Sequence, residues 1–505
     1  MSGIDLTAAP IKGFSRPLGN LEAFFKSLSD SGKPLNREHW TIHFVLRLKF
    51  PPSITDPIPH LQYAWETLRL RHPTLGATLK EPEGSSDRAS LSAGPLNVKE
   101  WTDNTFIVCH EHADAGQLFS SLYSTPTATC YWIPASCELV IRSSHWRIDG
   151  VGMALLGHEF MTALAKVVMI KPDTPERDSF HTELLSNPSS VPPSLEDLAK
   201  AQSTYSRSGE DDPILAAGAD ELVGIFLRGV PSIGLPARTS STAEPVPGPS
   251  ARVMAHLDAE KTTRVATACR RMGIKVTSAV HAAIVRVTAR FPQHPLSKSY
   301  AAFVPVDLRR ALDDTATLET KAISKVVGLY FSGLPICVDN VFTKSFEDIA
   351  QDLAIVYARD LSRFWSPIPT TETRIGDLKE KMIGLLDLAE PYVQRTTALF
   401  NTPVPEGLPP VQTPDLSSLG RMESSIKKEY GNDNSDRGGV QVLDFWVGTE
   451  MLTRNVQFHI WSWDGSLRLG ASFNTSFYEK GFVADVVQAV IRELLDGCGI
   501  GNDDE

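Results

Sequence analysis

The sequence predicts an α+β protein built from two halves. Its 505 residues exceed what one hydrophobic core usually supports, so two domains are expected. Each half mixes strand-like and helix-like segments without the regular β-α-β repeat of a doubly wound sheet. Between residues 171 and 251 the pattern loosens into Pro-, Ser- and Gly-rich sequence. We therefore predict an N-terminal half at residues 1–185, a crossover linker at 186–250 and a C-terminal half at 251–505.

Composition limits the partners. The chain has 49 Lys and Arg against 60 Asp and Glu, and its formal charge of -11 disfavours nucleic acid. No apolar run is expected to reach membrane-spanning length, and the N-terminus carries no apolar signal segment. The six cysteines lack paired spacing, which predicts neither a disulfide framework nor a zinc site. We expect a cytoplasmic protein with no membrane partner. We also expect a monomer, because the two halves supply each other's interface.

The N-terminal half opens with a clear strand and a clear helix. Residues 40–50 alternate and are rich in β-formers, which predicts a strand that ends at Pro51. An apolar stripe predicts a helix over residues 58–70 that breaks before Pro73. Shorter elements are predicted as strands at 74–79, 98–101 and 130–134, and as a helix at 114–123.

The rest of the chain is organised around residues 143–152, which read Ser-Ser-His-Trp-Arg-Ile-Asp-Gly-Val-Gly. They follow a predicted strand at 137–142 and lead into an apolar helix at 153–168, so His145 and Asp149 fall on the connection between the two. Gly150 allows the chain to turn sharply there. Histidine titrates near neutral pH and can take a proton from an alcohol or an amine. His145, Asp149 and Gly150 are therefore the candidate catalytic residues.

The C-terminal half repeats the mixture of strands and helices. A strand at 251–257 precedes helices at 258–272 and 277–291, with a break at Gly273. The dipeptide Asp464-Gly465 predicts a hairpin turn. The remaining predictions are strands at 300–310, 326–338, 440–448, 455–463 and 466–473, helices at 346–364 and 479–495, a loop at 403–439 and a frayed tail at 497–505.

Several segments resemble one known superfamily in the expected order. The segment from His145 to Gly150 fits the HxxxDG signature shared by chloramphenicol acetyltransferase, peptide-synthetase condensation domains and BAHD acyltransferases. The resemblance covers residues 40–495 and is closest to fungal acyltransferases of the trichothecene 15-O-acetyltransferase type. Its other segments are Arg71-His72-Pro73, residues 277–287, Val304 to Arg309, and Asp444-Phe445-Trp446-Val447-Gly448, which resembles the BAHD segment DFGWG.

Two departures from the superfamily patterns stand out. The fourth segment reads DFWVG, so the glycine turn of the BAHD pattern is altered and a plant-type assignment is in doubt. Ser144 stands where condensation domains usually carry a second histidine, which weakens the condensation alternative.

The resemblance implies a fold and a reaction. The fold would be two chloramphenicol-acetyltransferase-like domains side by side with a central substrate tunnel. The reaction would be CoA-dependent O-acyl transfer, in which His145 is the general base and a hydroxyl of a secondary metabolite is the acceptor. Acetyl-CoA is the expected cosubstrate, and no cofactor would be bound permanently.

The same resemblance gives supporting roles. Asp149 would hold its loop by pairing with an arginine, with Arg309 as first choice and Arg71 as second. If that pair is buried, removing one member should cost roughly 3 to 5 kcal/mol. Asp444 and Gly448 would support the shape of the channel, although a plain strand end with buried aromatics explains them equally well.

Other readings stay open at this stage. His145 and Asp149 could bind a metal, but no third ligand stands at helpful spacing, so no metal site is predicted. The oxyanion donor could be a backbone amide near Gly150 or a hydroxyl in residues 466–476. A Gly-x-Ser-x-Gly elbow is absent, which disfavours a serine hydrolase. Rival functions are a condensation-type enzyme that uses an acyl carrier protein, a cyclase-like enzyme and a non-catalytic binding protein.

Overall fold

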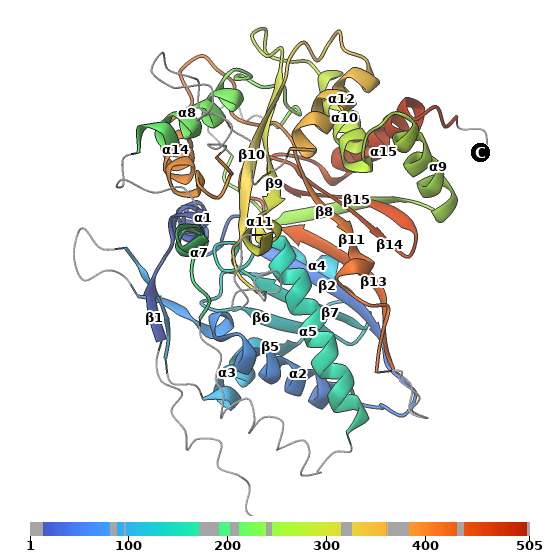
Figure 1. Ribbon diagram of the computed structural model, residues 1–505. Coiled ribbons are helices and arrows are strands. Elements are labelled where there is room, and N and C mark those ends of the chain that lie inside the picture. Colours follow the sequence, from blue (N-terminus) through green and yellow to red (C-terminus); the bar gives the residue numbers. More distant parts are fainter. Residues whose placement is uncertain are drawn as a thin grey trace, which may run out of the picture. The chain divides into compact units, whose positions relative to one another are not determined.

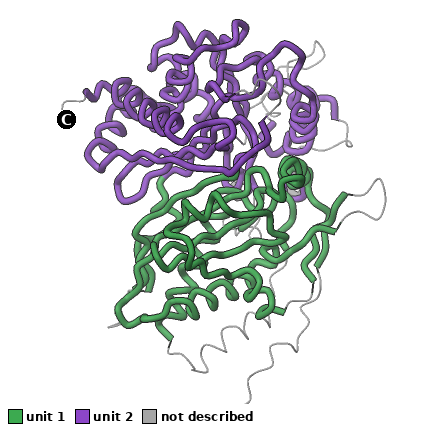
Figure 2. Tube along the Cα trace, turned by 180° about the vertical axis from the view of Figure 1, so that it is seen from behind, with its two compact units in different colours: residues 1–194, 325–329, 421–450 green, residues 195–324, 330–420, 451–505 purple. Residues whose placement is uncertain are grey.

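The chain folds into two compact units (Figure 2). The computed structural model describes residues 14–80, 88–94, 97–170, 191–202, 212–238, 245–314, 326–359, 361, 383–431 and 439–501. Unit 1 comprises residues 1–194, 325–329 and 421–450, and unit 2 comprises 195–324, 330–420 and 451–505. Each unit combines helices with sheets, which confirms the predicted α+β class with two domains.

The chain enters both units more than once, so neither unit is one continuous segment. The predicted crossover at 186–250 contains two helices, α7 (Leu195–Gln202) and α8 (Pro213–Leu227). The exact domain boundaries and the substrate tunnel stay predictions.

Unit 1 is built on a six-stranded sheet with the order β12-β13-β2-β7-β6-β5. All neighbouring strands are antiparallel except β5 and β6, which are parallel. The predicted strands at 40–50, 130–134, 137–142 and 440–448 are confirmed as central members. The strands are β2 (Ile42–Lys49), β5 (Phe106–Val108), β6 (Thr129–Ile133), β7 (Glu138–Ser143), β12 (Glu429–Tyr430) and β13 (Val440–Thr449).

Helices α2 (Ile58–Arg71) and α5 (Gly150–Met169) pack beside each other, and α5 contacts β2 and β13 (Figure 1). A Cβ at Gly157 would lie 2.5 Å from the Phe44 ring, so glycine allows α5 to approach the sheet closely. Side chains alternate along a strand, so His43 points to the opposite face, where it meets Phe119.

Helix α5 corrects one expectation. By length and composition it is apolar enough to cross a membrane, whereas the sequence was expected to contain no such run. However, 67% of its most apolar stretch is buried in the structure, as in the core helix of a folded domain.

Three small elements of unit 1 differ from prediction. The strand expected at 98–101 is helix α3 (Val98–Thr105), because the Asn97 side chain accepts a hydrogen bond from Glu100 N at 3.1 Å and caps a helix. The strand expected at 74–79 divides into a 3₁₀ turn (Pro73–Gly76) and β3 (Thr78–Lys80), since Pro73 favours a tight turn. The described part of unit 1 also contains helices α1 (Asn20–Asp30) and α4 (Ala115–Phe119) and strands β1 (Phe14–Pro17) and β4 (Ser90–Ala93).

Unit 2 contains a four-stranded sheet with the order β11-β14-β15-β8 and a two-stranded sheet of β9 and β10. The predicted hairpin is confirmed, with Asp464 and Gly465 at φ 53° and 74°, as a type I′ turn requires. The strands are β8 (Ser250–Leu257), β9 (Tyr300–Asp307), β10 (Phe331–Val338), β11 (Asp415–Arg421), β14 (Gln457–Trp463) and β15 (Ser466–Asn474).

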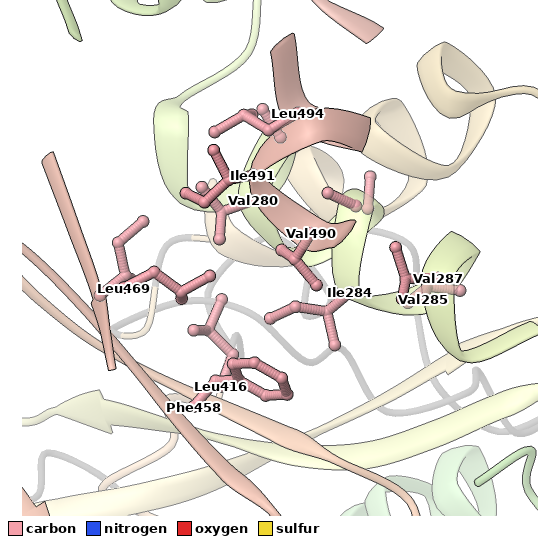
Figure 3. Close-up of a cluster of buried hydrophobic side chains, with 14 of the residues drawn as sticks. Val280, Ile284, Val285, Val287, Leu416, Phe458, Leu469, Val490, Ile491 and Leu494 are labelled. Carbon is pink, nitrogen blue, oxygen red and sulfur yellow. The ribbon is translucent and has the colours of Figure 1, made fainter. Parts of the chain in front are cut away.

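Helices α10 (Val276–Ala289) and α15 (Lys480–Gly497) form the core of unit 2 with the four-stranded sheet. Figure 3 shows side chains from both helices facing side chains of the sheet, among them Val280, Ile284, Val490, Leu494, Phe458 and Leu469. Besides α7 and α8, the residues of this unit that the structure describes also form α9 (Ala259–Arg271), α11 (Arg309–Asp314), α12 (Phe346–Tyr357) and α14 (Ala389–Asn401).

Two expectations for the last third of the chain are wrong. The loop predicted at 403–439 contains β11 and β12, because paired neighbours stabilise these short strands even though Pro and Ser weaken the local pattern. The predicted frayed tail begins too early, since Cys498 and Ile500 are buried against the core of unit 2. Helix α12 ends at Tyr357, and residues 360 and 362–364 of the helix predicted at 346–364 lie outside the described residues.

Candidate active site

The loop from Ser144 to Asp149 connects the end of β7 to the start of α5. Asp149 is the N-cap of α5, and its Oδ1 accepts a hydrogen bond from Gly152 N at 2.6 Å. Its backbone N–H donates to Gly328 O at 3.1 Å. Gly150 is the first residue of the helix. The structure therefore brings His145, Asp149 and Gly150 together on one short connection of unit 1, as the sequence indicated.

His145 packs against two aromatic side chains. Its ring stacks on Phe25 from α1, with 4.6 Å between centroids and 15° between planes. Trp40 lies next to it, tilted, at 6.3 Å. Burial lowers the pKa of His145 to about 4, although the negative charge of Asp149 opposes the shift. The imidazole is therefore neutral at neutral pH and able to accept a proton.

Polar side chains occupy the start of the same loop. Ser144 Oγ donates a hydrogen bond to the Glu38 carboxylate. His39 stacks on Trp40 at 4.8 Å, and burial lowers its pKa to about 3. The segment from Glu38 to Trp40 thus supports the loop, and sequence reasoning missed it because nothing in its pattern distinguishes it from an ordinary turn before a strand.

A buried ion-pair network holds the end of β7. Arg37 Nε bonds the Glu450 carboxylate, and Arg142 Nη2 lies 3.5 Å from Glu450 Oε2. Arg142 Nη1 donates to Thr125 Oγ1 at 3.1 Å. Burial raises the pKa of Glu450, and the two arginines oppose that rise. The network connects the end of β7, which precedes His145, to Arg37 before β2 and to Glu450 after β13.

Arg147, within the motif, anchors the loop to the body of unit 1. Its guanidinium donates to Ala77 O at 2.7 Å and Pro126 O at 3.2 Å, and also to Thr74 O. These bonds to backbone carbonyls fix the loop geometry. Arg147 could not be singled out from the sequence, because it occupies a variable position of the signature.

Both predicted arginine partners of Asp149 have another acidic neighbour, and their pairing with Asp149 stays a prediction. Arg71 Nη1 is 3.7 Å from Glu159 Oε2 on α5, so this second choice has an acidic partner other than Asp149. Arg309, in unit 2, pairs with Asp307 at 2.8 Å. A pairing of Arg309 with Asp149 stays a prediction.

The segment from Asp444 to Gly448 forms part of β13. Asp444 Oδ1 accepts a hydrogen bond from Phe445 N at 2.8 Å, beside a register shift between Val442 and Asp444. Gly448 pairs with His43, and a Cβ there would lie 3.2 Å from the Phe119 ring. These contacts agree with a strand end among buried aromatics, and a role in channel shape stays a prediction.

One group of possible metal ligands was not predicted from the sequence. The ligand atoms of Cys109, Glu111 and His112 all lie within 4.8 Å of one another after β5. Cys109 and Glu111 are two positions apart and His112 follows directly, which does not match the spacing of a zinc pattern. This group could therefore not be predicted from the sequence. The expectation that the protein holds no metal stays a prediction.

Comparisons with known proteins agree with the observed fold. No family model matches the chain. Among solved structures, trichothecene 15-O-acetyltransferase TRI3 from Fusarium sporotrichioides superposes with a TM-score of 0.71 at 14% identity, over 96% of this chain and 95% of that one. The chain has the fold of this acetyltransferase. The epimerization domain from the third module of tyrocidine synthetase B also superposes, with a TM-score of 0.56 at 13% identity, over 97% of this chain and 98% of that one.

Sequence relatives come from fungi. The chain is 25% identical to acetyltransferase pigO of Monascus ruber, over 97% of each chain. It is 28% identical to loline biosynthesis cluster 1 transcription factor lolU1 of Epichloe uncinata, over 96% of this chain and 95% of that one. The predicted resemblance to fungal acetyltransferases is confirmed, and these similarities support an acyltransferase of secondary metabolism.

Proposed function

We propose that the protein transfers an acyl group, in the first instance acetyl, from acyl-CoA to a hydroxyl group of a small secondary metabolite. The observation that carries the proposal is the position of His145, which stacks on Phe25 and lies on a fixed loop at the end of β7. A thioester is already activated, so the protein has to supply a base for the acceptor and a site that orients both substrates.

The imidazole of His145 takes the proton of the acceptor hydroxyl as its oxygen attacks the thioester carbonyl carbon. The tetrahedral intermediate collapses, its carbon–sulfur bond breaks, and the CoA thiolate leaves. The imidazolium then gives its proton to that sulfur, so the products are an ester and free CoA. General-base help of this kind contributes about a hundred- to ten-thousand-fold to the rate. No acyl-enzyme forms on this route.

The surroundings of His145 suit this role. The rings of Phe25 and Trp40 pack beside the imidazole and form an apolar environment. Because this environment disfavours the charged imidazolium, the base stays unprotonated before the reaction. The charge of Asp149 favours the imidazolium once it forms. The loop needs little reorganisation, because Arg147 and the cap of α5 already fix it.

The rivals differ from this proposal in observable ways. An enzyme that takes its acyl group from a carrier protein would use free acyl-CoA poorly, and Ser144 in place of a second histidine speaks against the peptide-bond-forming type. A cyclase-like enzyme would act without any thioester. The relative lolU1 bears the name of a transcription factor, but the net charge of -11 on the present chain opposes binding to DNA phosphates.

The test is product identification. Purified protein is incubated with acetyl-CoA or longer acyl-CoA donors and a panel of hydroxylated terpenoid and polyketide acceptors, and products are analysed by mass spectrometry. The proposal expects an acceptor ester whose mass follows the donor acyl chain. Products that form equally without thioester, or no ester with any donor and acceptor from folded protein, would contradict it.

A further inference from the structure

A pocket of about 380 Å³ opens within unit 1, and neither His145 nor Asp149 lines it. It lies where α3 meets the segment after α2 and the segment before β6, and residues of all three line it. Its volume is within the range of about 300 to 1,000 Å³ that is usual for small-molecule sites. The space is therefore large enough for a small ligand or for one end of a longer one.

Three residues that line the pocket carry buried hydrogen-bond donors. Within the described part of the chain, Arg69 Nε, Trp101 Nε1 and Thr129 Oγ1 are buried and have no hydrogen-bond partner. Buried polar atoms in folded proteins are nearly always satisfied, so three such atoms around one space need an explanation. Two of them, the guanidine and indole N–H groups, can only donate. The missing partner is therefore an acceptor.

Arg69 adds positive charge to these donors. Arg69 is only 5% exposed, and its guanidinium forms no salt bridge with a carboxylate among the described residues. Burial lowers the pKa of its guanidinium to about 10, which leaves the group charged at neutral pH. A buried charge without a counter-ion is costly. An acceptor that is also an anion would offset that cost.

The guanidinium is held in a fixed place. Its Cζ lies 5.6 Å from the centroid of the Trp101 ring, which in turn stacks on Trp65 at 5.0 Å. On another side it covers Gly76, where a Cβ would overlap it. This preorganisation is what a recognition site for a planar, charged group requires.

The wall of the pocket is polar and carries little negative charge. Glu100 is the one acidic residue among the described residues that line it, and this side chain is exposed. Hydroxyl and amide side chains make up much of the rest, including Asn97, Asn104, Thr105, Thr125 and Thr127. Such a wall suits a hydrated or hydrogen-bonding ligand better than an apolar one.

The pocket also shares its wall with the anchor of the His145 loop. Pro126 lines the pocket, and its carbonyl accepts a hydrogen bond from Arg147 at 3.2 Å. Gly76 lines it as well, next to Ala77, whose carbonyl accepts from Arg147 at 2.7 Å. A ligand in the pocket would thus contact the segments that hold the motif in place.

We propose that this pocket is an oxyanion-binding site, in which Arg69, Trp101 and Thr129 donate hydrogen bonds to a carboxylate or phosphate group. Both groups present acceptor oxygens in the geometry that a guanidinium fork matches. The proposal is independent of the role of His145.

The test uses inorganic phosphate and acetate as separate probes, with ionic strength held constant by chloride. Binding to the full-length protein is measured by calorimetry and by the shift in thermal unfolding. We expect saturable binding of at least one probe, and the probe that binds more tightly tells a phosphate ligand from a carboxylate ligand. Arg69→Gln should weaken the binding about ten- to a hundredfold, because a hydrogen bond to a charged group is lost. Trp101→Phe and Thr129→Val, which remove one donor each, should weaken it by smaller factors.

Lys99→Gln is the matched control. Lys99 lies on α3 two residues from Trp101, and its side chain is 80% exposed, so it tests for non-specific attraction of anions. Its variant should bind as the wild type does. The proposal is overturned if neither probe binds saturably to the wild type, or if Lys99→Gln weakens binding as much as the pocket variants do. If Arg69→Gln does not fold, unchanged binding in both Trp101→Phe and Thr129→Val overturns it as well.

Discussion

The imidazole of His145 lies nearly parallel to the phenyl ring of Phe25, with 4.6 Å between the centroids and 15° between the planes. The two residues are 120 positions apart in the sequence, and the N-terminal helix α1 carries the phenyl ring. The stack holds the imidazole by one face and leaves its edge to interact with other groups. Phe25 is therefore a positioning residue for the proposed base.

Replacing Phe25 with Leu tests this role. The variant keeps an apolar side chain but removes the stack, which is worth about 0.5 to 1.5 kcal/mol. We expect kcat to fall about two- to tenfold with little change in the KM for acyl-CoA. Phe106→Leu, at a buried phenylalanine of β5, is the control for loss of aromatic packing in unit 1. An equal loss of kcat in the control would show that Phe25 has no special role.

Asp149 offers a test that separates capping from ion pairing. Its side chain caps α5 through Gly152 N, and asparagine caps a helix nearly as well as aspartate. We expect Asp149→Ala to lower the free energy of unfolding by about 1 to 2 kcal/mol and Asp149→Asn to change it little. Chemical denaturation measures both. A loss of about 3 to 5 kcal/mol in Asp149→Asn would instead indicate a buried pair with an arginine such as Arg309.

Acid should destabilise the protein through its buried histidines. Burial lowers the pKa of His281 to about 3. Its Nε2 lies 2.8 Å from the Tyr300 hydroxyl oxygen, and its Nδ1 lies 2.9 Å from the Tyr357 hydroxyl oxygen. The unfolded chain binds the proton at an ordinary pKa of about 6.5. Between pH 6.5 and 3 the unfolded state therefore binds more protons, so stability is full above this window and falls as the pH drops through it.

His281→Gln removes this titration and keeps hydrogen-bonding atoms at the site. We expect the slope of the thermal midpoint against pH to become shallower between pH 4 and 6.5, while the midpoint at neutral pH falls. His256→Gln, at an exposed position of β8, should keep the wild-type slope. An unchanged slope in His281→Gln would mean that His281 is already protonated in the folded state or contributes nothing.

Gly157 tests the packing of the helix that follows the motif. A Cβ at this position would lie 2.5 Å from the Phe44 ring, so Gly157→Ala should lower the free energy of unfolding by about 1 to 3 kcal/mol through overpacking. Phe44→Leu makes room for the added methyl group. The double variant should therefore lose less than the sum of the two single variants. Strict additivity in denaturant unfolding would contradict the close approach of α5 to β2.

The sequence predicted the elements whose signals are local and strong. Alternation identified β2, and the Asp464-Gly465 pair identified the hairpin. A strand-like run followed by an apolar helix placed His145 and Asp149 on one connection. It failed where pairing with distant residues stabilises a short element, as in β11 and β12. It also failed at α3, where one capping asparagine decides between strand and helix.

The surroundings of the candidate site were harder to predict than the motif. Phe25 and Trp40 are ordinary aromatic residues in their local segments, and only the tertiary fold brings them to His145. The same holds for the contacts of Arg147 with Ala77 and Pro126. Such contacts join residues far apart in the chain and leave no periodic pattern.

The most direct test of the central claim is acceptor-dependent release of free thiol from acetyl-CoA, measured for the wild type, His145→Ala and Phe106→Leu. The wild type and the control variant should release thiol when an acceptor is present. His145→Ala should fold normally and lose about a hundred- to ten-thousand-fold in kcat. Thiol release by His145→Ala at the wild-type rate would contradict the assignment of His145 as the general base.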